Sequence, residues 1–147
     1  MQTEFEQELT GAREQLDAAR EELLAVVGAL SDADLARSRR GGWAVARVLE
    51  HVIQSEWLYA GLVAHLHDRP SPGDVVTGIP TSVADAIDRL AASHRALLAA
   101  LDGVDEASFY RLRAVGHEEY SILSVLENGT NHDREHAGQV QAILSAG

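Results

Sequence analysis

At 147 residues the chain is long enough for one domain with a core of its own, and its 5% aromatic content suits packed helices better than a sheet. The formal net charge of −11 argues against nucleic acid as a partner, because phosphate binding needs a concentrated basic surface. The chain holds no cysteine, no apolar run of about 18 residues and no basic, apolar leader, so we expect a cytoplasmic protein without disulfides or a membrane partner.

The first segment predicts one long amphipathic helix. Its apolar residues recur in steps of three and four: Phe5, Leu9, Ala12, Leu16, Ala19, Leu23, Val26 and Leu30. This heptad-like spacing is typical of helices in shallow, left-handed bundles. Ser31, with Asp34 three positions on, forms a capping box that opens a short second turn of helix. Gly41 and Gly42 then break the chain before Trp43.

A second long helix is predicted over residues 44–67, and a third begins at a cap on Thr81 or Ser82. Residues 68–80 hold all three prolines and two glycines, so this segment is expected to be a loop. A connection of this length permits a crossover between parallel helices. The third helix is expected to end at Asp102-Gly103.

A short helical turn is expected over residues 105–109, followed by a polar stretch that contains Gly116 and His117. Ser121 is predicted to cap the fourth long helix, which reaches about Leu144. No repeat or internal linker interrupts the chain. The pattern therefore predicts an all-α fold, a four-helix bundle in a single domain over residues 1–147.

Two histidines near the C-terminus are the most informative residues. His132 and His136 are four positions apart, so their Cβ atoms lie about 5–6 Å apart on a helix surface. Neutral imidazoles at that separation can reach one cation at about 2.0–2.1 Å each. Both fall on the stripe that should face the core: Ile122, Val125, Gly129, His132, His136, Gln139 and Ile143. Polar groups on such a stripe need a partner.

His51 lies on the inward stripe of the second helix and is predicted to be the third metal ligand. Three protein ligands with open positions are typical of a catalytic metal rather than a structural one. His94, on the seam of the third helix, has several readings. These readings are a fourth metal ligand, a hydrogen-bond donor to a metal ligand, a substrate contact, and a partly buried histidine bonded to a neighbour.

Other polar residues near these histidines also have alternative readings. Gln139 either orients a bound water or ligand or lies at the bundle edge. Asp133, Glu135, Glu50 and Glu56 are expected to face solvent or to hold the N–H of a coordinating imidazole. A di-iron carboxylate site needs two Glu-x-x-His motifs, and the segment 133–136 is only a single aspartate version.

The sequence resembles the DinB/YfiT-like superfamily, a group of DinB-like metal-dependent four-helix bundle proteins. The resemblance is densest in segments 43–51 and 131–139, which contain Trp43, His51 and the run His132-x-x-x-His136-x-x-Gln139. It covers essentially the whole chain. It implies up-down-down-up topology with a long crossover between the second and third helices. The family's histidine triad maps onto His51, His132 and His136.

The resemblance implies a divalent metal such as Zn²⁺ or Ni²⁺ on the triad, and a homodimer. It also implies a transferase that joins bacillithiol or mycothiol to small electrophiles. We expect the metal to lower the pKa of the thiol, with His94 as an auxiliary acid or base. Gln139 and the arginines Arg37, Arg39 and Arg40 are expected to contact the co-substrate. Two alternatives stay open: a hydrolase using metal-bound hydroxide, and a non-catalytic, stress-linked binding or dimerisation module.

Overall fold

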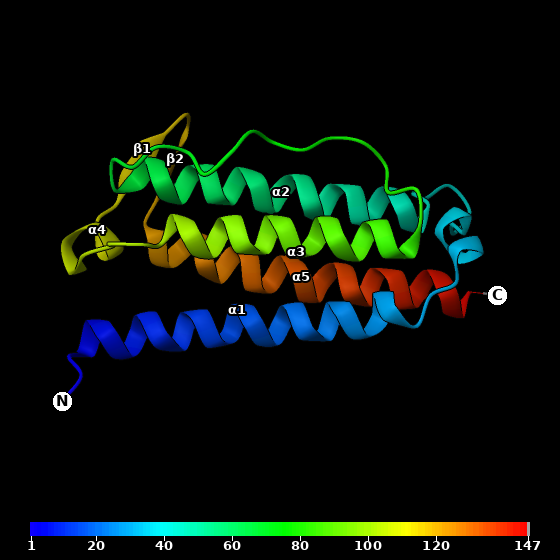
Figure 1. Cartoon of the computed structure of the whole chain (residues 1–147), viewed down its shortest axis with the longest axis horizontal. Coiled ribbons are helices and arrows are strands. Elements are labelled where there is room, and N and C mark those ends of the chain that lie inside the picture. The colour runs from blue at the N-terminus through cyan, green and yellow to red at the C-terminus, as the bar shows by residue number, and fades with distance from the viewer. Residues whose placement is uncertain (147) are drawn as a thin grey trace.

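The computed structural model describes residues 1–146 and consists mainly of four long helices that lie side by side (Figure 1). They are α1 (Glu4–Gly28), α2 (Val45–Leu66), α3 (Val83–Ala100) and α5 (Ile122–Ser145). A short 3-10 helix, η1 (Asp32–Ala36), follows α1, and a short helix, α4 (Glu106–Tyr110), follows α3. The predicted all-α fold is confirmed.

The four long helices run up, down, down and up. α2 and α3 run parallel, and the segment between them crosses the length of the bundle on its outside (Figure 1). α1 packs on α5 and α3, and α2 packs on α3 and α5. The topology and the crossover expected from the resemblance are therefore confirmed. No helix among residues 1–146 is both long and apolar enough to cross a membrane.

The helix starts follow the predicted caps. The side chains of Ser31, Ser82 and Ser121 accept hydrogen bonds from the backbone N–H groups of Asp34, Asp85 and Ser124. Each such cap satisfies a donor that has no partner inside the helix. Of the two predicted candidates, Ser82 and not Thr81 is the N-cap of α3.

The polar stretch before α5 differs from the expected loop. It forms a hairpin of β1 (Arg113–Val115) and β2 (Glu118–Tyr120), in which Arg113 pairs with Tyr120. The two-residue turn begins at Gly116, whose φ of +64° suits glycine in the first position of a hairpin turn. The strands are too short to show alternating hydrophobicity, and a glycine-led turn was the only signal.

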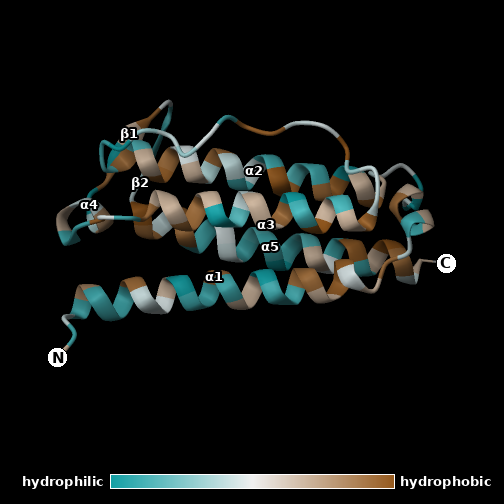
Figure 2. Cartoon of the chain, viewed as in Figure 1, coloured by the Kyte–Doolittle hydropathy of each residue, from teal (hydrophilic) through white to brown (hydrophobic). Residues whose placement is uncertain are grey.

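The core has two apolar clusters separated by a buried polar layer. One cluster includes Leu23, Leu49 and Val140, and the other includes Leu16, Val63 and Leu126. Arg20, Glu56, Ser93 and Asp133 lie between the two clusters along the four helices, and all are buried. Figure 2 shows α5 as hydrophilic in its middle and hydrophobic toward both ends. The candidate histidines lie at this middle level.

Candidate metal centre

The structure brings the three predicted metal ligands together. The Nε2 atom of His132 lies 3.0 Å from the Nε2 atom of His51 and 3.0 Å from that of His136. One ring nitrogen from each of the three histidines lies within 4.8 Å of the other two. His51 and His132 are half-buried and His136 is buried. α2 supplies the first histidine and α5 supplies the other two.

The local sequence explains this convergence. His132 and His136 are one helical turn apart on α5, and α5 packs directly against α2. The ring of His51 lies edge-on to both, with centroid distances of 4.9 Å to His132 and 4.9 Å to His136. The 3.6-residue period thus aligns two ligands, and helix packing adds the third.

Gln139 fixes the tautomer of His136. The Nδ1–H of His136 donates a 2.6 Å hydrogen bond to the side-chain oxygen of Gln139. In a neutral imidazole the other nitrogen then carries a lone pair, and that nitrogen is the Nε2 that faces His132. A hydrogen-bond acceptor on the second nitrogen is the usual support for a ligating histidine.

The surroundings of His132 and His51 favour the neutral form that a metal requires. Burial, followed by the neighbouring His136 and His51, lowers the pKa of His132 from 6.5 to about 4. Burial, followed by His136 and Arg47, also lowers the pKa of His51. Loss of hydration and crowding by other imidazoles both disfavour the protonated ring.

A cation shared by the three histidines would account for the contacts among their Nε2 atoms. An imidazole nitrogen either donates one N–H or offers one lone pair. The His132 nitrogen therefore cannot make two good hydrogen bonds, to His51 and to His136. Nitrogens 3.0 Å apart that each lie about 2.1 Å from one ion would subtend about 90° at it. The donor set, three neutral imidazoles with room for further ligands, fits a divalent transition metal.

Aromatic side chains border the triad. The Trp43 ring lies edge-on to His51 at 5.5 Å, and the Arg47 guanidinium lies 4.5 Å from the centroid of the Trp43 ring. Trp43 keeps 43% of its surface exposed, so it lies at the edge of the bundle. The Tyr59 ring lies 5.9 Å from His132 on the other side.

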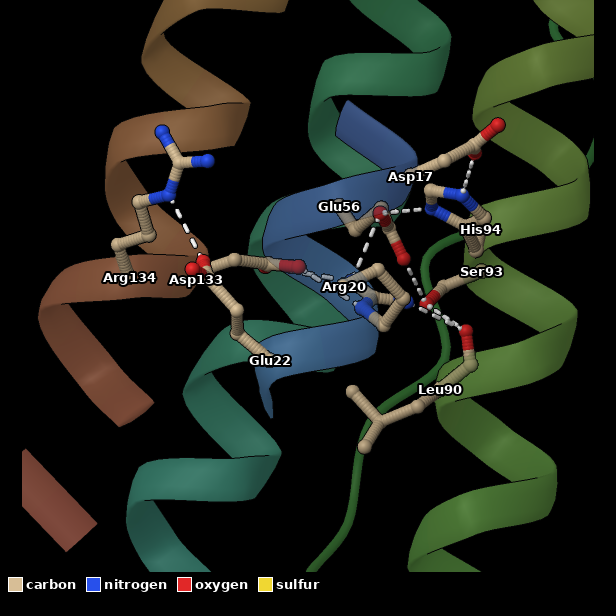
Figure 3. Close-up of polar contacts among 9 residues, drawn as sticks. All are labelled: Asp17, Arg20, Glu22, Glu56, Leu90, Ser93, His94, Asp133 and Arg134. Atoms are coloured by element: carbon tan, nitrogen blue, oxygen red, sulfur yellow. Dashed lines mark hydrogen bonds and ion pairs between the residues drawn. The ribbon is translucent and has the colours of Figure 1, made fainter. Parts of the chain in front are cut away.

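The buried polar layer is centred on Arg20 and includes Asp133, the residue that follows His132 (Figure 3). The Arg20 Nε–H and Nη2–H groups donate to the two carboxylate oxygens of Asp133 at 2.8 and 3.3 Å, and Arg20 Nη2 lies 2.8 Å from Glu56. Arg20 Nη1 also donates to the backbone carbonyl of Leu90 at 2.8 Å. One guanidinium on α1 therefore contacts the three other long helices.

This layer corrects two expectations. Asp133 and Glu56 neither face solvent nor hold a triad imidazole, since both are buried and paired with Arg20. Burial raises the pKa of Asp133, although Arg20 opposes that effect. Burial also acts to raise the pKa of Glu56, but hydrogen bonding to His94 and the charge of Arg20 outweigh it and lower that pKa. Of the two remaining carboxylates, Glu135 is exposed and Glu50 pairs with Arg47.

Sequence reasoning missed Arg20, although a signal was present. Arg20 lies four positions after Leu16 and three before Leu23, on the stripe that faces the core. A charged residue at an inward position indicates a buried partner, because an unpaired charge in a core is very costly. The sequence did not indicate that Asp133 is this partner, because Asp133 is 113 positions away in the chain.

His94 lies in the polar layer and not among the converging nitrogens. Its Nδ1 is 3.1 Å from a Glu56 oxygen and its Nε2 is 2.8 Å from an Asp17 oxygen. Burial lowers the pKa of His94, but the hydrogen bonds to the two carboxylates outweigh it, so the pKa is raised. Both ring nitrogens face carboxylates, an arrangement that favours the protonated ring, in which both nitrogens donate. The predicted acid–base role of His94 stays a prediction.

The remaining candidate residues fall into two places. Gln139 contacts His136, as described above. Arg39 and Arg40 line a surface hollow with Arg37 near the C-terminal end of α5. Among residues 1–146, the group of side chains placed to share a metal contains three histidines and no carboxylate, so the di-iron alternative gains no support.

The comparison with protein families agrees with this geometry. The DinB superfamily matches residues 15–140, a range that includes all three histidines and Gln139. No curated protein and no solved structure matches the chain.

Proposed function

This chain belongs to the DinB superfamily, and we propose that it is a metal-dependent thiol S-transferase acting on small electrophiles. The metal is a divalent ion, Zn²⁺ or Ni²⁺, held by His51, His132 and His136. The thiol is a low-molecular-weight co-substrate, bacillithiol or mycothiol, because the chain has no cysteine of its own. The observation that carries the proposal is the meeting of three Nε2 atoms, with 3.0 Å between neighbouring nitrogens.

The residues of this chain have separable tasks in the proposed reaction. The neutral imidazoles present lone pairs, and Gln139 holds the proton of His136 on Nδ1, away from the centre. A divalent ion bound there would act as a Lewis acid and lower the pKa of a coordinated thiol. In the transfer itself, sulfur forms a bond to an electrophilic carbon, the thiol proton passes to solvent, and the leaving group departs with its electron pair.

Metal binding is the first test. Purified protein without a His-tag is analysed for bound metal, together with the variants His51→Ala, His132→Ala and His136→Ala. Each variant is expected to lose most of its metal, because two imidazoles bind a divalent ion far more weakly than three. His117→Ala is the matched control, because His117 is exposed in the hairpin turn. Full occupancy in the His136→Ala variant contradicts the assignment.

Thiol-dependent turnover is the second test. The metal-loaded protein is mixed with monochlorobimane and either bacillithiol or mycothiol, and fluorescence follows the displacement of chloride by sulfur. Conjugation that requires both the thiol and the triad supports the proposal. Turnover of an electrophile without added thiol supports a hydrolase instead, and a protein that purifies and stays metal-free supports a non-catalytic module. Sedimentation analysis tests the expected homodimer separately.

A further inference from the structure

A basic hollow lies at the C-terminal end of α5. Arg37, Ser38, Arg39 and Arg40, between η1 and α2, line it together with Ile143 and Ala146 at the end of α5. Its volume is about 570 Å³, enough for a small molecule or part of one. Three of the chain's 12 basic residues meet here, although the formal net charge is −11. Like charges gathered in one hollow favour an anion as the occupant.

The loop that carries the arginines has a fixed backbone. The N–H of Val45 donates to the carbonyl of Arg37 at 2.9 Å, and the N–H of Gly42 donates to the carbonyl of Arg39 at 2.9 Å. Gly41 lies between these contacts with a φ of +76°, a conformation that suits glycine. The arginine positions are thus set by the turn.

The three arginines differ in how they are engaged. Arg37 is anchored, because its guanidinium donates to the carbonyl of Leu144 at 2.9 Å and to Asp34 at 3.4 Å. Among the partners within residues 1–146, neither Arg39 nor Arg40 has a side-chain hydrogen bond or an ion pair, and both are exposed. Their guanidinium donors are therefore available to the paired oxygens of a carboxylate or a phosphate.

The hollow and the triad share one face of α5. His136, Gln139 and Ile143 follow one another on the same stripe, and the seven residues from His136 to Ile143 rise about 10 Å along the helix. The loop that carries the arginines ends at Trp43, whose ring centroid lies 5.5 Å from that of His51. The hollow and the triad are therefore separated by about two turns of α5, a length that a small molecule can cover.

We propose that this hollow binds the anionic group, a carboxylate or a phosphate, of the small molecule that reacts at the metal centre. The inference rests on the proposed function and adds the substrate class: an anion whose charged group is held near Ile143, about two helical turns along α5 from His136. Arg39 and Arg40 donate to the anionic oxygens, while Arg37 keeps the loop against α5 and adds positive charge.

Anion binding to the purified protein tests the site directly. Inorganic phosphate and succinate are titrated separately into the zinc-loaded protein and followed by calorimetry. The double variant Arg39→Gln/Arg40→Gln is expected to bind the preferred anion at least about tenfold more weakly, because two charge-assisted contacts are lost. The control Arg13→Gln/Arg95→Gln removes the same charge from exposed positions on α1 and α3 and is expected to stay within about twofold. Equal weakening in both double variants, or no binding of either anion to the unmodified protein, overturns the proposal.

A second measurement separates this proposal from the proposed function. Metal affinity is measured on the same proteins and is expected to be unchanged in the Arg39→Gln/Arg40→Gln variant. In the cobalt-loaded protein, phosphorus relaxation should show that the bound phosphate is not a direct ligand of the ion. Phosphate found as a direct metal ligand, with unchanged affinity in the double variant, overturns the proposal and leaves the metal site standing. A protein that holds no metal but still needs Arg39 and Arg40 for phosphate overturns the proposed function, and with it the link to a metal centre, but leaves an anion site in the hollow.

Discussion

The Arg20 Nε–H group donates a 2.8 Å hydrogen bond to Asp133, the residue that follows His132 in α5. The same guanidinium lies 2.8 Å from Glu56, on the helix that carries His51. One buried cation therefore joins the two helices that supply the triad (Figure 3). The guanidinium of Arg20 lies between the buried carboxylates of Glu56 and Asp133, and Glu56 also contacts His94. We expect the spacing between α2 and α5, and with it the arrangement of the three imidazoles, to depend on this layer.

Arg20→Met is expected to lower the free energy of unfolding by about 3–5 kcal/mol, because it leaves Glu56 and Asp133 buried without their cation. Metal affinity should fall as well, since α2 and α5 lose their common partner. Urea unfolding and a zinc competition assay measure the two effects. Arg134→Met is the control, because it removes a 2.8 Å pair with Glu22 that is largely exposed and worth about 0–1 kcal/mol. Equal losses in the two variants contradict the role given to Arg20.

Gln139→Leu is expected to weaken metal binding by about 10- to 100-fold, because His136 loses the acceptor that keeps its proton on Nδ1. The triad itself stays in place, so the helical circular dichroism spectrum should not change. Competition with a chromophoric chelator measures the affinity. Gln139→Glu keeps an oxygen acceptor at this position and should retain tight binding. A Gln139→Leu variant that binds zinc as tightly as the unmodified protein rules out this supporting role.

Zinc is expected to stabilise the folded chain. At a free concentration of 100 times its dissociation constant, a ligand that binds only the folded state adds about 2.7 kcal/mol. Removal of zinc by a chelator should reverse this gain, and thermal unfolding with and without metal measures it. His51→Ala should abolish most of the gain, whereas His117→Ala, at an exposed position, should keep it. A gain of the same size in both variants would place the zinc elsewhere.

The stability that His94 provides should decrease toward alkaline pH. Burial acts against the charged ring, but hydrogen bonds to Glu56 and Asp17 outweigh it and raise the pKa above the ordinary 6.5. Because the folded-state pKa is the higher one, this stabilisation is complete below pH 6.5 and is lost as the pH rises through the folded-state pKa.

The measurement for His94 is the difference in unfolding free energy between the unmodified chain and His94→Gln, followed by urea unfolding across this pH range. The difference removes the contributions of groups common to both proteins. It should be largest in mildly acidic solution and shrink above neutrality. A difference that does not vary with pH means that the ring is neutral in the folded state and contradicts the assignment.

Helix periodicity made the four long helices and the candidate histidine triad predictable. Serine caps marked the starts of α3 and α5, and glycine and proline breaks marked the loops between helices. The four-residue spacing placed His132 and His136 on one face, because side chains at that spacing are neighbours in any α-helix. His51 could be named as inward-facing for the same reason. These are local properties, so a single sequence contains them.

Only the tertiary structure decided which polar side chains meet. Asp133 lies one position from the candidate ligand His132 and was expected to face solvent or an imidazole, yet it pairs with Arg20, 113 positions earlier. The pairing depends on how α1 packs against α5, and side-chain pattern does not specify such a contact across helices. Likewise, Arg39 and Arg40 line a hollow with Ile143 only because the end of α5 reaches their loop. Local sequence sets which residues face inward, and helix packing sets which partner each one finds.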